Sequence, residues 1–129
     1  MKDLKNNLDV VASIKPAVYT ASADGVGVDL RGFDGAVAVF ESGTVDNVDT
    51  NETYTPSVEE SDDNAVFTAV AAADLEGALT PMVDDEIQRV GYKGSKRYIR
   101  AVMTLAGTTP SFAGRASVIR GIPHRAPVA

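Results

Sequence analysis

The sequence predicts an all-β protein, an antiparallel β-sandwich of jelly-roll type with one short helix and extended N- and C-terminal arms. Turn signals recur about every 8–15 residues and separate roughly eight short strand-like segments, a spacing typical of two-layer all-β folds. The longest segment, residues 97–105, alternates with the period of two that a strand imposes. Only residues 71–76 have high helix propensity, and Gly77 ends that segment after about two turns. The predicted core face of the longest strand consists of Ile99, Ala101, Met103 and Leu105.

The chain of 129 residues suits a single domain with one core. We expect an arm over residues 1–15, a sandwich over residues 16–121 and a tail over residues 122–129. The arm is expected to be one short helix or an extended segment, and it ends before Pro16, because proline pushes the preceding residue out of the helical region. The tail contains two prolines and is expected to be extended.

The sequence contains no cysteine, which excludes disulfides and thiolate metal sites. Its first residues show no continuous apolar signal region, and no run reaches the roughly 18 apolar residues of a membrane helix. We therefore expect a protein that is made and kept soluble, without a membrane partner.

Two turns organise the first half of the predicted sandwich. Before the strand at residues 26–30, Asp24-Gly25 supplies the positive φ that a tight hairpin requires. A second turn at residues 32–35 leads into residues 36–40, which are apolar on both faces. A strand of that kind must be covered on both sides.

The second half begins with an acidic loop over residues 42–53, which has too little apolar surface to offset its ordering entropy. Residues 54–60 and 65–70 then form a hairpin, in whose turn Asp and Asn side chains bond the backbone two residues on. Pro56 favours an edge position in this hairpin or a strand that begins after it. Further strands are expected over residues 86–92, 97–105 and 111–120.

Charge is distributed unevenly along the chain. The net charge is −6, but residues 1–86 contain four Lys or Arg against all 18 acids, a net −14, while the rest contains eight bases and no acid. One interpretation is that acidic and basic strands neutralise each other within the fold. The other is that patches of opposite sign meet between neighbouring copies. A nucleic-acid face is the weakest interpretation, because the total charge is acidic and no aromatic residues alternate with the bases.

A cluster of bases surrounds the turn at residues 93–95. It can form an anion-binding or partner-binding face, or it can pair across strands with Glu59, Glu60 or Asp63. The tail adds the single histidine and a further arginine. The candidate interface residues are Lys93, Lys96, Arg97, Arg100, His124 and Arg125.

Catalytic residues are not predicted. His124 lies in a proline-bounded tail, which lacks the rigid support that a catalytic histidine needs. Paired acids such as Asp62 and Asp63 are neighbours in sequence and point to opposite faces of a strand, so they are poor acid and base partners. The acidic turns lack the spacing of an EF-hand, and Gly25-Val26-Gly27 lacks the rest of a dinucleotide fingerprint. We expect no enzyme activity, no metal and no cofactor.

Residues 58–70, followed by residues 96–102, resemble the strand and turn series of discoidin-like jelly rolls. That resemblance covers about a fifth of the chain and implies a carbohydrate-binding module. The aromatic content is against this alternative, since the chain has no Trp, four Tyr and four Phe, whereas sugar sites favour aromatic platforms.

A second resemblance extends over nearly the full length. The residues that carry it are Asn6-Asn7-Leu8, Pro16-Ala17-Val18-Tyr19, the turn Glu59-Glu60-Ser61-Asp62-Asp63-Asn64, the segment Gly91-Tyr92-Lys93-Gly94-Ser95-Lys96-Arg97-Tyr98-Ile99-Arg100, and the tail Gly121-Ile122-Pro123-His124-Arg125-Ala126-Pro127-Val128. In these segments the chain is similar to small virion structural proteins of tailed bacteriophages and prophages.

The phage resemblance implies a non-enzymatic capsid decoration, or cement, protein. Its expected partners are the major capsid protein and copies of itself, with no nucleic acid, and its expected location is the capsid surface after synthesis in the host bacterial cytoplasm. A head-to-tail connector or a tail component is the alternative within the virion.

Overall fold

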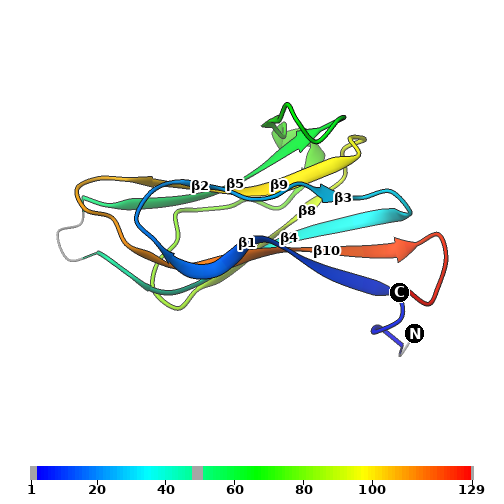
Figure 1. Ribbon diagram of the computed structural model, residues 1–129, viewed down its shortest axis with the longest axis horizontal. Coiled ribbons are helices and arrows are strands. Elements are labelled where there is room, and N and C mark those ends of the chain that lie inside the picture. The colour runs from blue at the N-terminus through cyan, green and yellow to red at the C-terminus, as the bar shows by residue number, and fades with distance from the viewer. Residues whose placement is uncertain (1–2, 48–50, 129) are drawn as a thin grey trace.

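A computed structural model describes residues 3–47 and 51–128, and it shows two β-sheets packed face to face (Figure 1). The expected arm and loop therefore extend in part outside the described residues. The elements in chain order are β1 (Leu8–Tyr19), β2 (Ala23–Asp24), β3 (Val28–Asp29), β4 (Phe33–Val45), β5 (Thr53–Ser61), β6 (Thr68–Ala69), the 3-10 turn η1 (Ala72–Asp74), β7 (Leu75–Glu76), β8 (Ile87–Tyr92), β9 (Tyr98–Ala106) and β10 (Phe112–Pro123).

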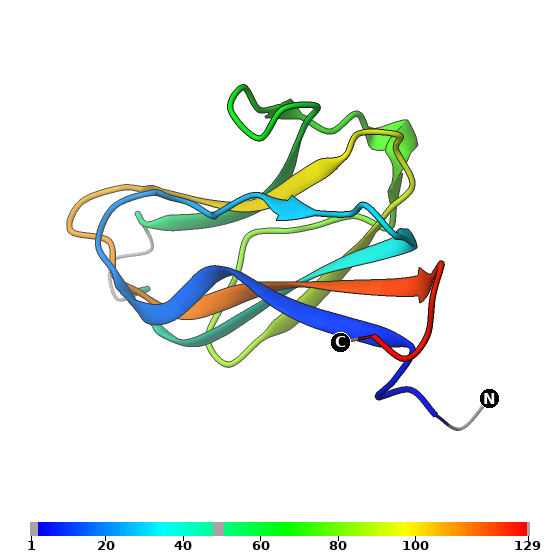
Figure 2. The ribbon, with the colours of Figure 1, turned by 45° about the vertical axis from the view of Figure 1, so that its right-hand side comes forward.

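Every strand pairing is antiparallel, as predicted. Sheet A has the order β1-β10-β4-β8-β7, and sheet B has the order β2-β9-β5-β6, with β3 also on β9. The chain crosses between the sheets several times: β1, β4, β7, β8 and β10 lie in sheet A, and β2, β3, β5, β6 and β9 lie in sheet B (Figures 1 and 2). The all-β sandwich is confirmed, and this crossing pattern is compatible with the expected jelly-roll type.

The core lies between the sheets and is built from alternate residues of the long strands. In β9, Ile99, Ala101 and Met103 are buried as predicted, and Leu105 is partly buried against them. From sheet A, the side chains of Phe40 and Phe112 are fully buried. Two layers of inward-facing apolar side chains thus fill one core.

The predicted helix over residues 71–76 is only a single 3-10 turn. Residues 75–76 leave it at once to form β7, which pairs with β8. Sheet pairing therefore outweighs the helix propensity of the alanines, because a segment of two turns is too short to be stable as a helix alone.

The N-terminal segment is part of the sheet from residue 8 onward. β1 runs through the boundary expected at residues 15 and 16 and pairs with β10 along its length. Its register shifts between Ala12 and Ile14 and again between Ile14 and Ala17. These irregularities allow Pro16 to lie within an edge strand, where a missing N–H costs no ladder bond.

The C-terminal segment folds back on the chain itself. β10 continues to Pro123, the N–H of His124 donates to the carbonyl of Gly32 (2.8 Å), and the N–H of Val128 donates to the carbonyl of Asn6 (2.9 Å). Both ends of the described chain therefore lie near the edge of sheet A (Figure 2).

Gly25 is required for a reason other than the predicted positive φ. It is not among the glycines with positive φ, and residues 23–24 and 28–29 both pair with β9 rather than with each other. A β-carbon at Gly25 would lie 2.7 Å from the carbonyl oxygen of Ala101 and against the hydroxyl of Ser13. The predicted hairpin is therefore wrong, and close packing between the sheets explains the glycine.

Ser13 joins the two sheets at this point. Its hydroxyl accepts from the N–H of Ala101 (2.9 Å) and donates to the carbonyl of Val26 (2.9 Å), and its own carbonyl accepts from the N–H of Val26 (2.8 Å). The side chain is buried. The register shift of β1 thus places a polar residue where it bonds a strand of the opposite layer.

The hairpin of β5 and β6 is confirmed, but only Glu59 and Glu60 of β5 pair with β6. Along the rest of β5 the side away from β9 has no strand partner, and Pro56 lies in that part. Its edge position is as predicted.

Candidate functional site

Four of the six predicted interface residues line one pocket at an end of the sandwich. The pocket has a volume of about 510 Å³ and lies between residues 30–36, which lead from β3 into β4, and residues 92–97, which lead from β8 into β9. The four residues are Lys93, Lys96, Arg97 and His124.

Each of these four residues is held by an acid from the first two-thirds of the chain. Lys93 pairs with Glu76 (2.8 Å), Lys96 with Asp62 (2.8 Å) and His124 with Asp34 (2.7 Å). The guanidinium of Arg97 donates two hydrogen bonds to the carboxylate of Asp29, at 3.0 and 2.8 Å. Of the four acids only Asp34 also lines the pocket, so its lining is mainly basic, and Lys93, Lys96 and Arg97 retain donors for a further partner.

The protonation of these groups follows from their pairing. The hydrogen bond from Arg97 lowers the pKa of Asp29 from 3.8 to about 2, although burial partly opposes this change. Hydrogen bonds to Glu76 and Asp62 raise the pKa of Lys93 and of Lys96, respectively. Asp29, Lys93 and Lys96 are therefore charged at neutral pH.

Tyr92 forms the inner wall of the pocket and connects it to β5. Its hydroxyl donates to Glu60 (2.7 Å) and accepts from the N–H of Lys96 (3.0 Å). Burial, followed by the bond to Glu60, raises the pKa of the phenol. Gly94 passes over this ring so closely that a β-carbon would lie 2.5 Å from the hydroxyl. The turn before β9 therefore requires glycine at this position.

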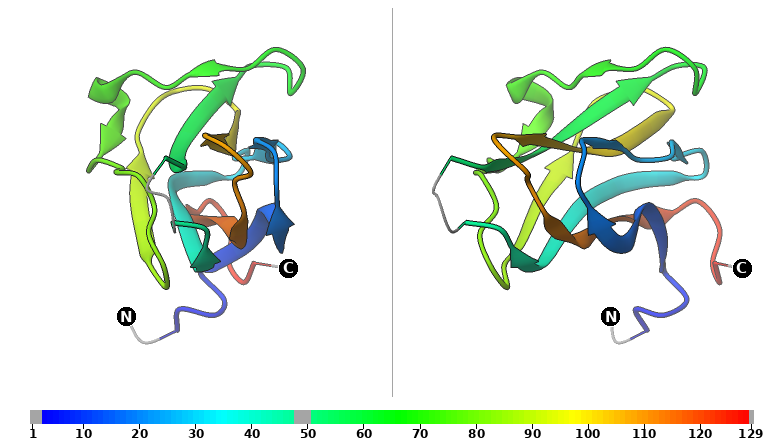
Figure 3. Two further views of the ribbon diagram at one scale, coloured as in Figure 1. Left: turned by 90° about the vertical axis from the view of Figure 1, so that its left-hand side faces the viewer. Right: turned by 60° about the vertical axis from the view of Figure 1, so that its left-hand side comes forward.

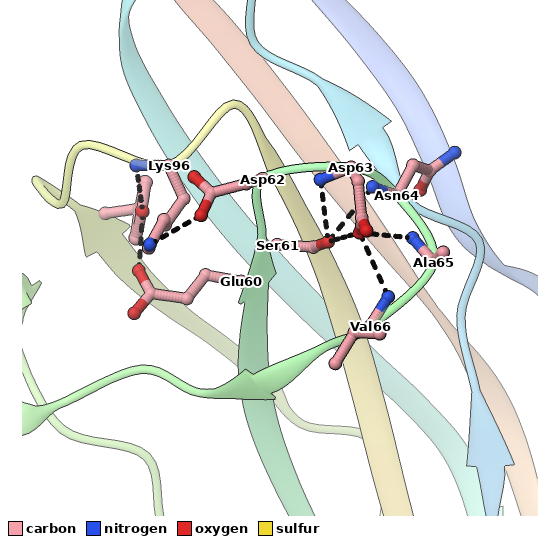
Figure 4. Close-up of polar contacts among 9 residues, drawn as sticks. Glu60, Ser61, Asp62, Asp63, Asn64, Ala65, Val66 and Lys96 are labelled. Carbon is pink, nitrogen blue, oxygen red and sulfur yellow. Dashed lines mark hydrogen bonds and ion pairs between the residues drawn. The ribbon is translucent and has the colours of Figure 1, made fainter.

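The turn at residues 61–66 lies beside Lys96 and is held by its own side chains (Figure 4). The hydroxyl of Ser61 accepts from the N–H groups of Asp63 (3.2 Å) and Asn64 (3.0 Å) and donates to the carboxylate of Asp63. That carboxylate accepts from the N–H groups of Ala65 (3.0 Å) and Val66 (3.1 Å). These last bonds, followed by the one from Ser61, lower the pKa of Asp63. The predicted Asx-type turn is confirmed.

Arg100 lies on the outer face of sheet B, away from the pocket. Its guanidinium bonds Glu59 at 2.9 and 2.6 Å, lies 3.8 Å from Asp24, and stacks over the ring of Phe67 at 4.2 Å from its centroid. Pairing with Glu59 is one of the cross-strand partners expected from the sequence. Arg125, the sixth predicted residue, has no hydrogen bond or ion pair with any residue that the structure describes.

Internal neutralisation accounts for most of the uneven charge. Six of the eight bases after residue 86 pair with acids before it, among the described residues, and these six include Arg115 with Glu41 (2.5 Å) and Arg120 with Asp9. The acidic partners Asp29, Asp34 and Glu76 were not identified from the sequence. A sequence pattern shows which strands carry charge, but strand order decides which charges meet.

A second surface, which the sequence analysis did not identify as a site, is the outer face of sheet A. Its register places the side chains of Leu8, Val10, Val37, Val39 and Ile119 on one side of neighbouring strands. Sheet B packs on the opposite side of sheet A, and the described residues form no further layer on this side (Figure 3). Val10 is exposed, and the other four side chains are half-buried. In the sequence, this face is indicated by residues 36–40, which are apolar on both sides of the strand. The core covers one side of that strand, and the described residues leave the other side without a covering layer.

Neither surface contains a metal cluster. Within residues 3–47 and 51–128, no group of three or more His, Asp or Glu is arranged to hold a metal ion. The same residues include no helix that is long and apolar enough to span a membrane.

Comparison with known proteins shows a fold likeness. No family model matches the chain, and no curated protein matches it. Among solved structures, the chain is similar to the PBSX exported protein XepA, with a TM-score of 0.60 and 16% identity over 100% of this chain and 41% of that one. A weaker likeness is to a structure of infectious bursal disease virus Gx strain, with a TM-score of 0.49 and 8% identity over 92% of this chain and 32% of that one.

The likeness to XepA extends over the whole sandwich, so the two proteins share this fold. The chain spans less than half the length of either protein. At this level of identity the comparison describes architecture, and it assigns no residue a role.

Proposed function

We propose that the protein is a non-enzymatic virion structural protein of a tailed bacteriophage or prophage, a capsid decoration protein that binds the major capsid protein on the outer surface of the head. The observation that carries the proposal is the uncovered apolar outer face of sheet A. Large exposed apolar patches on a folded domain mark interaction surfaces. The sequence resemblance to small phage structural proteins and the fold likeness to a PBSX protein support a phage particle as the setting.

The basic pocket supplies a second contact in this proposal. Lys93, Lys96, Arg97 and His124 surround it, and their remaining donors suit carboxylates on a partner surface. Such rim charges set orientation and association rate more than affinity. Raising the salt concentration is therefore expected to slow binding to the particle and to leave the folded domain unchanged.

The experiment is co-sedimentation of the purified protein with capsids that lack decoration. We expect the wild type to sediment with the capsids and Val10→Asp to stay in the supernatant. Val10 is 57% exposed on the apolar face, so the change places a charge in the proposed contact at little cost to folding. Thr104→Asp, at an exposed position of β9 in sheet B, is the matched control and should bind like the wild type.

Failure of the wild type to sediment with capsids would reject the decoration role. Equal binding by both aspartate variants would reject the apolar face as the contact. The number of copies in an intact particle separates decoration from the connector alternative, because a connector forms one ring whereas decoration repeats over the head.

A further inference from the structure

We propose that a hollow in the outer face of sheet A receives the turn at residues 61–66 of a second copy of this chain, so that copies associate head to tail. This inference rests on the proposed function and names the contact through which copies of the protein meet. The hollow takes up the part of the face around Gly121, whereas Val10 and Val39 do not line it and remain available for the capsid contact. Two features support the inference. One is Gly121 in the hollow, where the fold has room for a side chain. The other is the ordered turn on the opposite side of the molecule, which presents the exposed Val66.

The hollow has a volume of about 930 Å³ and crosses β1, β10, β4 and β8. Its floor contains Gly35, Gly91 and Gly121, and the first and last of these are direct register partners on neighbouring strands. Gly121 presents bare backbone, whereas Gly35 lies against the side chain of Ile122 and Gly91 against that of Glu76. The apolar walls are formed by Leu4, Leu8, Val37, Ile119 and Ile122.

Nothing in the fold requires glycine at position 121. Its φ is not positive, and a β-carbon there would have no atom within 4 Å. Glycine in the interior of a strand costs about 0.5–1 kcal/mol relative to alanine. In such a position it commonly marks the close approach of a ligand or another chain. Contact with a second molecule therefore accounts for a glycine that the folded chain leaves unexplained.

The turn at residues 61–66 provides a protrusion that fits this hollow. Val66 is 69% exposed, and the turn that presents it is fixed by the hydrogen bonds of Ser61 and Asp63. Figure 4 shows these bonds converging beneath the segment that leads to Val66. A turn that is already ordered loses little conformational entropy on binding.

Charge also favours this occupant. The turn carries Asp62 and Asp63, and Glu60 directly precedes it. The charged residues that line the hollow are Glu76, which is paired with Lys93 at 2.8 Å, and Arg89, which has no hydrogen bond or ion pair with another described residue. An acidic turn is therefore attracted to Arg89, and this orients the apolar tip toward the glycine floor.

The two surfaces lie on opposite sides of the sandwich. The turn extends from the sheet B side, whereas the hollow faces outward from sheet A (Figures 1 and 3). Contact between two different patches is heterologous, so each copy can bind one neighbour through its turn and another through its hollow.

The test is analytical ultracentrifugation of wild type and two pairs of variants over a range of concentrations. Gly121→Val should weaken self-association about tenfold or more, because the new side chain fills the hollow. Its melting temperature should be unchanged or higher, since the fold has room for the side chain and valine favours strands. The matched control is Gly43→Val, another β4 and β10 neighbour whose β-carbon would make only ordinary contacts, the nearest at 3.7 Å, and it should associate like the wild type.

Val66→Ser removes the apolar tip and should likewise weaken association, whereas Val83→Ser, another exposed valine, should not. A mixture of Gly121→Val and Val66→Ser gives the decisive result. The first variant retains a working turn and the second a working hollow, so together they should form a one-to-one dimer that neither forms alone.

A wild type that stays monomeric at every concentration, unaffected association of Gly121→Val, or a mixture without heterodimer would each overturn the inference. Its failure is distinguishable from failure of the proposed function. Wild type that self-associates in this pattern but does not bind capsids would reject decoration and support the contact, and the reverse result would reject the contact and support decoration.

Discussion

At the scale of single residues, the Tyr92 hydroxyl serves a carboxylate and a backbone N–H at once. Tyr92→Phe leaves the N–H of Lys96 and the carboxylate of Glu60 without this partner. We expect a loss of about 1–3 kcal/mol in the free energy of unfolding, measured by urea denaturation. Tyr98→Phe is the control, because its hydroxyl makes no hydrogen bond among the described residues, and equal losses in the two variants would contradict this account.

Asp29 gives the protein a defined sensitivity to acid. Its pKa is about 2 in the folded protein and 3.8 ordinarily, so its pairing stabilises the fold above about pH 3.8 and is lost as the pH falls toward about 2. Asp29→Asn should be less stable than the wild type near neutral pH, and the difference should shrink through this acid window. Denaturation at several pH values measures it, and a constant difference down to about pH 2 would argue against the pairing.

At the scale of elements, the two sheets depend on the bridge between β1 and β9. Ser13→Ala leaves the N–H of Ala101 without its buried acceptor, and we expect a loss of about 1–3 kcal/mol. Gly25→Ala should cost more, because its methyl group meets backbone as well as the serine. Thermal unfolding measures both. Ser117→Ala, on the outer side of β10, should change little.

A substitution at Arg100 distinguishes a role within the folded monomer from a role in contacts between copies. Because its guanidinium already bonds Glu59 and covers Phe67, Arg100→Glu should lower the free energy of unfolding by about 1–3 kcal/mol. Arg125→Glu provides the comparison, since Arg125 makes no such contacts with the described residues. Calorimetry of the monomer should therefore show a lower melting temperature for the first variant alone. An unchanged melting temperature for Arg100→Glu, together with lost assembly, would instead place this arginine at an interface.

The strand content could be predicted because alternation is local. Ile99, Ala101 and Met103 follow a period that depends only on the strand itself. By contrast, the role of Gly25 depends on Ser13 and Ala101, which lie in two different layers. The continuation of β1 through residues 15 and 16 has a related cause, since a proline is tolerated in a strand once pairing on one side is given up.

At the scale of the whole molecule, the unevenly distributed charges mainly form ion pairs between residues that lie far apart in the sequence. Asp9 meets Arg120 and Asp29 meets Arg97 across most of the chain length. The basic cluster could be predicted from composition, and four of its members do gather at one pocket. The glycine-floored hollow could not be predicted from the sequence, because its three glycines are far apart in the chain and become neighbours only through the strand order.

The position of β10 between β1 and β4 has a consequence for the order in which the protein is made. β10 is synthesised after the other strands of sheet A, and it joins β1 to the rest of that sheet. Before β10 is made, the acid-rich segment lacks most of the bases that pair with it, and charge repulsion favours an expanded chain. Sheet A is therefore completed only when β10 is present, and strand closure and charge neutralisation come with the same segment.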